Sequence, residues 1–161
     1  MQDFSIWVDA DSCPLSVKQI IFRFCERNNF PLFFVANRSI PIPKKENFKM
    51  IVCDATPDAA DNYIVENANE NDIIITRDIP LADRLVEKNI VVINDRGTLY
   101  TKENIKERLS IRNFNKELYT NGIVSEKTST FSKKDTNNFA NCFDREIQKK
   151  IKSNRHQEKT N

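Results

Sequence analysis

The chain has 161 residues, of which 39% are hydrophobic and 30% are charged, and its formal net charge is +2. This length and composition predict a single domain over residues 1–151, large enough to bury a core, and a disordered basic tail over residues 152–161. No apolar run approaches the roughly 18 residues that a membrane span needs, and no basic-then-apolar leader opens the chain. We therefore expect a soluble cytoplasmic protein without a membrane partner.

Cysteine and histidine usage excludes several kinds of chemistry. The four cysteines are scattered without a Cys-x-x-Cys spacing, and the only histidine, His156, lies in the polar tail. This pattern argues against a structural zinc site, and it excludes Ser-His-Asp and Cys-His catalysis within the folded region.

Charge is unevenly distributed along the chain. Residues 1–100 carry 11 Lys and Arg against 15 Asp and Glu, whereas residues 101–161 carry 14 against 8. We interpret this as an acidic body with a basic C-terminal segment that attracts phosphates, although solvated helices rich in Lys and Glu also produce such differences. Nothing in the sequence specifies an oligomeric state.

The N-terminal stretch combines a buried strand with two carboxylates. The apolar run Phe4–Val8 predicts a strand, Asp9 and Asp11 follow it, and Pro14 suits the first turn of a helix. This order places both carboxylates at the carboxyl end of a strand, where open α/β sheets bind ligands. Alternatively, Asp11 or Ser12 caps the helix, whereas Asp9 comes too early to do so.

Apolar runs and helical periodicities then alternate along the chain. They predict a helix over 15–28, strands over 32–36 and 50–53, a helix from Pro57 to about Asn69, a strand over 73–76, a helix from Pro80, a strand over 90–93, and helices over 101–121 and 137–151. Residues 123–136 are polar, and we expect them to be mobile. Four or five strands alternating with helices predict a three-layer α/β/α fold with a mostly parallel sheet, followed by C-terminal helices.

Two further acidic groups follow predicted strands. Asp58 and Asp61 lie three residues apart at the start of a predicted helix, so they share one face near its positive end. Asp78 follows the strand over 73–76. The alternatives are that Asp58 and Asp61 complement the helix dipole and that Asp78 caps the next helix.

The energy of bringing these carboxylates together points to a cation. If three of them converge within about 5 Å, each pair costs about 3 kcal/mol at an effective dielectric near 20, and three pairs cost roughly 10 kcal/mol, comparable with the stability of a whole domain. Such a cluster must hold a cation, gain protons or be spread by water. Oxygen ligands without His or Cys favour Mg²⁺ or Mn²⁺, which promote the attack of water on a phosphodiester. Backbone phosphates could bind to the basic arm and to the arginines at strand ends, namely Arg38, Arg77 and Arg96.

Taken together, five stretches resemble motifs of the YaiI/YqxD family of uncharacterised bacterial proteins: WVDADSCP (7–14), FFVANRSIPIP (33–43), DAADNYIV (58–65), DIIITRDIPLA (72–82) and INDRGTLYTKENI (93–105). The likeness extends over roughly residues 5–145. The family is grouped with PIN-like domains, whose characterised relatives are metal-dependent ribonucleases with a parallel sheet and clustered acids. The resemblance therefore implies a PIN-like domain, Mg²⁺ or Mn²⁺ as cofactor and RNA as partner.

The resemblance also implies roles for individual residues. Asp9 matches the family's first-strand acid, Asp58 and Asp61 the mid-chain acids, and Asp78 the acid of the fourth strand. Other positions match the same motifs: Asp11, Asn37, Asn62, Thr76 and Arg96. The chain departs from the family pattern at three places: Arg77 replaces a small residue, Asp95 replaces a proline, and residues 125–130 replace a glycine-rich patch.

Our hypothesis is a Mg²⁺- or Mn²⁺-dependent nuclease-like protein that acts on RNA. Asp9 and Asp78 would ligate the metal directly, with Asp11 and Asp61 as further metal ligands. Asp58 or Asp61 would complete the shell or orient water, so the catalytic residues would be Asp9, Asp58, Asp61 and Asp78. The substrate would contact residues that the motifs place around these acids: Asn37, Arg38, Asn62, Thr76, Arg77 and Arg96.

Two alternatives stay open. The first is a non-catalytic RNA-binding or regulatory module with a vestigial acidic site. The second is a phosphatase of the haloacid dehalogenase type, because Asp9-x-Asp11 after a first strand resembles its nucleophile and acid pair; that mechanism needs a nearby lysine, and Lys49 and Lys88 are poorly placed.

Overall fold

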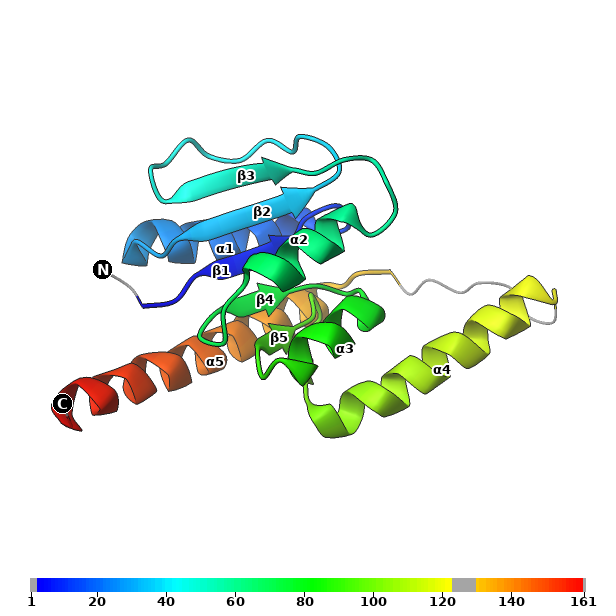
Figure 1. The fold of residues 1–161 in the computed structure, drawn as a ribbon. Coiled ribbons are helices and arrows are strands. Elements are labelled where there is room, and N and C mark those ends of the chain that lie inside the picture. Colours follow the sequence, from blue (N-terminus) through cyan, green and yellow to red (C-terminus); the bar gives the residue numbers. More distant parts are fainter. Residues whose placement is uncertain (1–2, 123–129, 161) are drawn as a thin grey trace.

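A computed structural model describes residues 3–122 and 130–160 (Figure 1). Its six strands form one sheet in the spatial order β3-β2-β1-β4-β5-β6. The strands are β1 Ile6–Asp9, β2 Leu32–Ala36, β3 Phe48–Val52, β4 Ile73–Ile75, β5 Val91–Ile93 and β6 Leu99–Tyr100. Strands β1 to β5 are parallel, and β6 pairs antiparallel with β5.

Helices cover both faces of the sheet. They are α1 Leu15–Asn28, α2 Ala59–Asn67, α3 Ile79–Glu87, α4 Lys102–Thr120 and α5 Lys133–Thr160. Buried side chains of α1 and α5 pack on one face, whereas those of α2, α3 and the first turns of α4 pack on the other (Figure 1). The predicted α/β class, with a mostly parallel sheet flanked by helices and followed by C-terminal helices, is confirmed.

The central strands β1, β2 and β4 are apolar except for Asp9 at the end of β1, because helices cover both faces of the sheet there. All three residues of β4 are at most 1% exposed. In β1, Trp7 stacks on Phe33 of β2 at 4.3 Å on the α2 side, whereas Ile6 and Val8 belong to the core on the α1 side. Alternation along a strand thus supplies two separate cores.

The helix starts follow local capping chemistry. Asp78 accepts a hydrogen bond from the backbone N–H of Leu81 at 2.9 Å, so the alternative that Asp78 caps the following helix is confirmed. Thr101 and Asn104 form a reciprocal capping box at the start of α4, where the sequence predicts a helix.

Several elements differ from the prediction, and β3 begins at Phe48 rather than at residue 50. The short edge strand β6 is not predicted, because two residues carry too little pattern. Helix α2 begins at Ala59 rather than Pro57, since Asp58 has the left-handed φ of 65° and ends the preceding turn.

Helix α5 is also much longer than the predicted 137–151, and the predicted disordered tail is wrong for residues 152–160, which are helical. Its early start is explained by Ser132 and Asp135, which cap it reciprocally. No proline or glycine interrupts residues 133–160, so the helix continues beyond the last packed side chain, Ile151. Residues 123–129, half of the predicted mobile segment 123–136, lie outside the described residues, and residues 133–136 belong to α5.

The topology places the ends of β1 and β4 at a switch point. From β1 the chain builds β2 and β3 on one side, and then crosses to build β4 and β5 on the other. Open α/β sheets bind ligands at the carboxyl ends of the strands where this reversal occurs. In the described part of the chain, no helix is both long and apolar enough to cross a bilayer.

Candidate functional site

A hydrogen-bonded chain joins the carboxyl ends of β1 and β4. The buried Thr76 hydroxyl donates to Asp9 Oδ2 at 2.8 Å and accepts from the Asp78 backbone N–H at 3.0 Å. The two aspartates are half-buried. Thr76 therefore holds Asp9 beside Asp78, as the order of strands predicts.

Asp61 of α2 is the third carboxylate of this edge. Burial and the charges of Asp78, Asp9 and Asp58 raise its pKa to about 6, and Arg84 opposes the increase. The pKa of Asp9 is also raised, mainly by burial, with Asp78 and Asp11 adding to the effect and the Thr76 hydrogen bond opposing it. The structure thus brings the strand-end acids and the α2 acids within electrostatic reach of one another. We call Asp9, Asp58, Asp61 and Asp78 the acidic rim.

The acidic rim is not a preformed cation cage. Within residues 3–122 and 130–160, no three His, Cys, Asp or Glu side chains lie close enough together to hold a metal ion. Asp78 also commits one oxygen to capping α3, and Asp58 lies exposed at the start of α2.

Asp11 and its neighbours form a separate group on the side of β2. Asp11 accepts from the Asn37 backbone N–H at 3.3 Å and lies 3.9 Å from Arg38 Nε. Asn37 therefore contributes its backbone to this contact. All three residues are exposed, so any ligand they bind lies at the outer edge of the acidic rim.

Arg77 forms an ion pair with a buried carboxylate, that of Asp95. Its Nε donates to Asp95 Oδ2 at 3.1 Å, and its Nη2 contacts the same oxygen. Asp95 is 4% exposed, whereas the Arg77 side chain is 46% exposed, so the guanidinium still borders solvent. The cavity beside this pair is only about 10 Å³, room for roughly one water molecule, so a larger ligand must lie on the open rim.

Two other predicted site residues have different partners. Arg96 lies 3.6 Å from Asp135 Oδ2 and over the Phe131 ring, which connects it to the start of α5. Asn62 Oδ1 accepts from Arg84 Nη1 at 2.9 Å, so this amide positions the arginine that borders Asp61.

Sequence reasoning missed two features. In the sequence, Asp95 stands out only as a departure from the family pattern. Its pairing with Arg77 forms because the turn after β5 lies beside the end of β4. The second feature is a basic face on α4, formed by Arg108, Arg112 and Lys116. Their four-residue spacing was visible in the sequence and is the signal that could have found them.

An α/β domain with clustered aspartates at its topological switch point is the class of protein that this geometry defines. The family model described as "Uncharacterized BCR, YaiI/YqxD family" matches residues 7–149, and the chain belongs to that family.

Similar proteins cover nearly the whole chain. A UPF0178 protein of Treponema denticola is 51% identical over 147 residues, which are 91% of this chain and 94% of that protein. A UPF0178 protein of Psychromonas ingrahamii is 44% identical over 92% of this chain and 99% of its own length. No solved structure matches the chain.

Proposed function

We propose that this protein is a PIN-like, Mg²⁺- or Mn²⁺-dependent nuclease that cleaves RNA at the acidic rim. The observation that carries the proposal is the position of Asp9, Asp78 and Asp61 at the switch point of the sheet, where Thr76 links Asp9 to the Asp78 backbone and where burial and three neighbouring aspartates raise the pKa of Asp61 to about 6. A strongly perturbed carboxyl beside other charged groups at a switch point is typical of a functional site.

The carboxylate oxygens of the acidic rim suit a hard cation, although three of these side chains do not lie close enough together in the described residues to hold one by themselves. Mg²⁺ commonly keeps several waters and is bound by one or two carboxylates together with substrate phosphates. Asp9 and Asp78, held beside each other by Thr76, would supply those carboxylates. When bound, the ion would activate water and stabilise the charge that develops on the phosphodiester oxygens.

The other residues of the rim would then have distinct roles. Asp61 has a pKa close to neutral pH, which suits a group that accepts a proton from an attacking water. Asp58 and Asp11 would attract or orient water at the edge. Arg77 would contact substrate phosphate through the exposed part of its guanidinium, while Asp95 positions it. Arg38 would contact phosphate on the β2 side.

A phosphatase mechanism receives no support from Lys88 or Lys49, because both lie away from the acidic rim. Lys88, at the far end of α3, donates to the Val65 carbonyl oxygen at 2.6 Å. Lys49 lies within β3, at the edge of the sheet away from β4. Neither is placed to stabilise a phosphorylated Asp9.

A non-catalytic RNA-binding module is the second candidate, and one observation favours it. In the described residues, the acids do not form a three-ligand set. The two candidates differ in whether the rim is needed for cleavage.

The test is cleavage of labelled single-stranded and hairpin RNA by the parent protein and by Asp9→Asn, with Mn²⁺ and with EDTA. We expect Mn²⁺-dependent cleavage by the parent and a loss of at least about 100-fold in Asp9→Asn, the range for groups that act at the reacting centre. The matched control is Asp83→Asn, because Asp83 lies on α3 but pairs with Lys106, and it should stay within about twofold. An absence of cleavage, with RNA affinity unchanged in Asp9→Asn, would support the non-catalytic module instead.

A further inference from the structure

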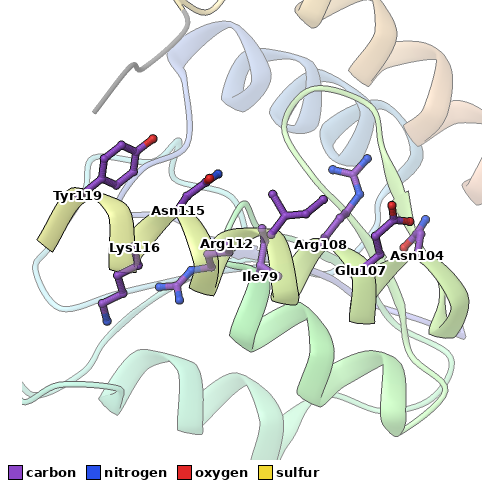
Figure 2. Close-up of a pocket in the computed structure, with 9 residues that line it drawn as sticks. Ile79, Asn104, Glu107, Arg108, Arg112, Asn115, Lys116 and Tyr119 are labelled. Carbon is purple, nitrogen blue, oxygen red and sulfur yellow. The ribbon is translucent and has the colours of Figure 1, made fainter. Parts of the chain in front are cut away.

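A groove lies between α4 and the first residue of α3. It has a volume of about 730 Å³, and Ile79 lies beneath the middle of α4 within it (Figure 2). Ile79 directly follows Asp78 of the acidic rim, so the groove begins beside the candidate site and continues along α4.

One face of α4 supplies a row of cations to this groove. Arg108, Arg112 and Lys116 recur every four residues, about 6 Å apart along the helix axis, and Figure 2 shows all three among the lining residues. All three are exposed, and no ion pair joins them to a carboxylate of residues 3–122 or 130–160. The groove contains one acid, Glu107, so its charge is positive.

The other face of α4 contrasts with the groove. Lys106 contacts Asp83 Oδ1 at 2.8 Å and Glu87 Oε1 at 3.2 Å, so it serves to attach α4 to α3. Within the described residues, no carboxylate forms an ion pair with Arg112 or Lys116, which leaves their charge available to a ligand.

Tyr100 lies near both a cation of the groove and a carboxylate of the acidic rim. The Arg108 guanidinium lies over the Tyr100 ring at 5.7 Å from its centroid. Burial raises the pKa of Tyr100, Arg108 lowers it, and Asp95 and Asp78 raise it further. Arg108 of the groove and Asp78 of the acidic rim therefore both lie within electrostatic range of Tyr100.

An aromatic side chain lies at the outer end of the groove. Tyr119 is 37% exposed, and the amide of Asn115 lies beside it on the same face. A cationic track with exposed aromatic and amide groups is how proteins bind single strands without sequence preference, since phosphates follow the cations and a base stacks on the ring.

We propose that this groove binds the backbone of single-stranded RNA and leads it past Ile79 to the acidic rim. The choice of RNA rests on the proposed function, whereas the cationic groove itself does not. A second copy of this chain is a poorer occupant, because a two-fold contact through the groove would place two rows of cations against each other.

The test is the affinity of a 5′-labelled 20-nucleotide oligouridylate, measured by fluorescence anisotropy in EDTA over a range of salt. The variant Arg112→Gln/Lys116→Gln should bind about tenfold more weakly at about 0.1 M salt, and its salt slope should fall by about 1.4, corresponding to two lost phosphate contacts. The matched control, Lys152→Gln/Arg155→Gln, removes the same net charge from exposed positions of α5 and should bind within about twofold of the parent.

Substitution of Tyr119 tests RNA binding by the groove without changing its charge. Tyr119→Ala should weaken binding by about tenfold through the loss of base stacking, and Tyr119→Phe should restore it. Equal losses in the two charge variants would overturn the proposal. So would a loss confined to Lys152→Gln/Arg155→Gln on α5.

Failure of the groove and failure of the nuclease proposal give different results. If RNA binding in EDTA requires Arg112 and Lys116 but the parent does not cleave RNA in Mn²⁺, the groove proposal stands and the nuclease proposal is rejected. Cleavage with an unchanged KM in Arg112→Gln/Lys116→Gln rejects the groove and retains the nuclease. Ile111 is an exposed apolar residue of the same groove. Sedimentation that shows a dimer of the parent, dissociated by Ile111→Glu, would assign this face to a second copy and overturn the proposal.

Discussion

Asp61 is the carboxyl whose surroundings most oppose ionisation at the acidic rim. Its pKa is raised to about 6 because it is partly buried and faces Asp78, Asp9 and Asp58. The unfolded chain, with an ordinary aspartate, loses this proton near pH 4. The folded state therefore holds a proton that the unfolded state has lost between about pH 4 and pH 6, and this contribution to stability disappears as the pH rises through that window.

We predict that Asp61→Asn stabilises the protein at pH 7. A shift of about two pKa units corresponds to nearly 3 kcal/mol, and partial solvent exposure reduces the expected gain to about 1 kcal/mol. The measurement is urea unfolding at pH 7 and pH 4, and the gain should vanish at pH 4, where Asp61 is already protonated. A loss of stability at pH 7 would show that the carboxylate has a stabilising partner.

Asp72 shows the opposite use of a buried carboxylate. It is 3% exposed and accepts three hydrogen bonds, from Trp7 Nε1 at 3.0 Å and from the backbone N–H groups of Ser5 and Asn69 at 2.8 Å each. These donors compensate the negative charge of Asp72 and hold together the segments that lead into β1 and β4. Asp72 precedes a strand in the sequence, whereas Asp9 and Asp78 lie at the ends of strands, but only the structure shows the buried donors that surround Asp72.

Asp72→Asn should therefore destabilise the protein by about 3 kcal/mol, because the amide replaces one acceptor by a donor that faces buried N–H groups. Urea unfolding followed by the fluorescence of Trp7, the only tryptophan, measures this directly. The exposed Glu70→Gln in the same turn is the control, and an equal effect in both variants would contradict the role of the buried network.

At the scale of elements, strands and helices were predictable where pattern and capping agreed. The bounds of α1 and β2 match the prediction, because each is a continuous periodic or apolar run between clear breaks. The convergence of Asp9 and Asp78 also followed from strand order. Pairings across the fold were not predictable: Arg77 finds Asp95 only because β5 lies beside β4, and nothing local specifies that contact.

The C-terminal helices were the least predictable elements. In α4, Phe114 follows Ile105 and Leu109 at helical spacing but is 60% exposed, because the helix extends beyond the core after its first turns (Figure 1). Periodicity identifies a face but not whether anything packs on it. The same argument explains the tail of α5, where helix propensity continues after packing ends.

Docking of α5 depends on one glycine. Gly97, in the turn before β6, has a φ of +83°, and a Cβ atom there would lie 2.8 Å from the Phe139 backbone nitrogen and clash with the Asn138 carbonyl. We predict that Gly97→Ala costs more than about 3 kcal/mol, since both the backbone conformation and the helix contact are lost.

Gly122→Ala is the matched comparison. Gly122 has a similar φ of +70°, but no described atom lies within 4 Å of the position that an added Cβ atom would take, so we expect only the conformational cost of about 1 kcal/mol. Thermal unfolding of both variants separates the two effects. Equal losses would mean that α5 does not pack closely on this turn.

At the scale of the whole molecule, two regions of opposite charge lie next to each other. The acidic rim occupies the switch point of the sheet, and the cationic groove of α4 begins one residue away, at Ile79. A polyanion would be attracted along the groove and repelled by the rim unless a cation neutralises the rim. This arrangement links the two proposals, and it makes divalent-ion binding the first requirement of the account.

Calorimetric titration of Mn²⁺ at pH 6, in two buffers of different ionisation enthalpy, tests that requirement most directly. We predict binding to the parent with release of up to about half a proton from Asp61, and no binding to Asp9→Asn/Asp78→Asn, while Asp83→Asn binds like the parent. Mn²⁺ binding that persists after both carboxylates are lost, or no binding to the parent at millimolar Mn²⁺, would contradict the account.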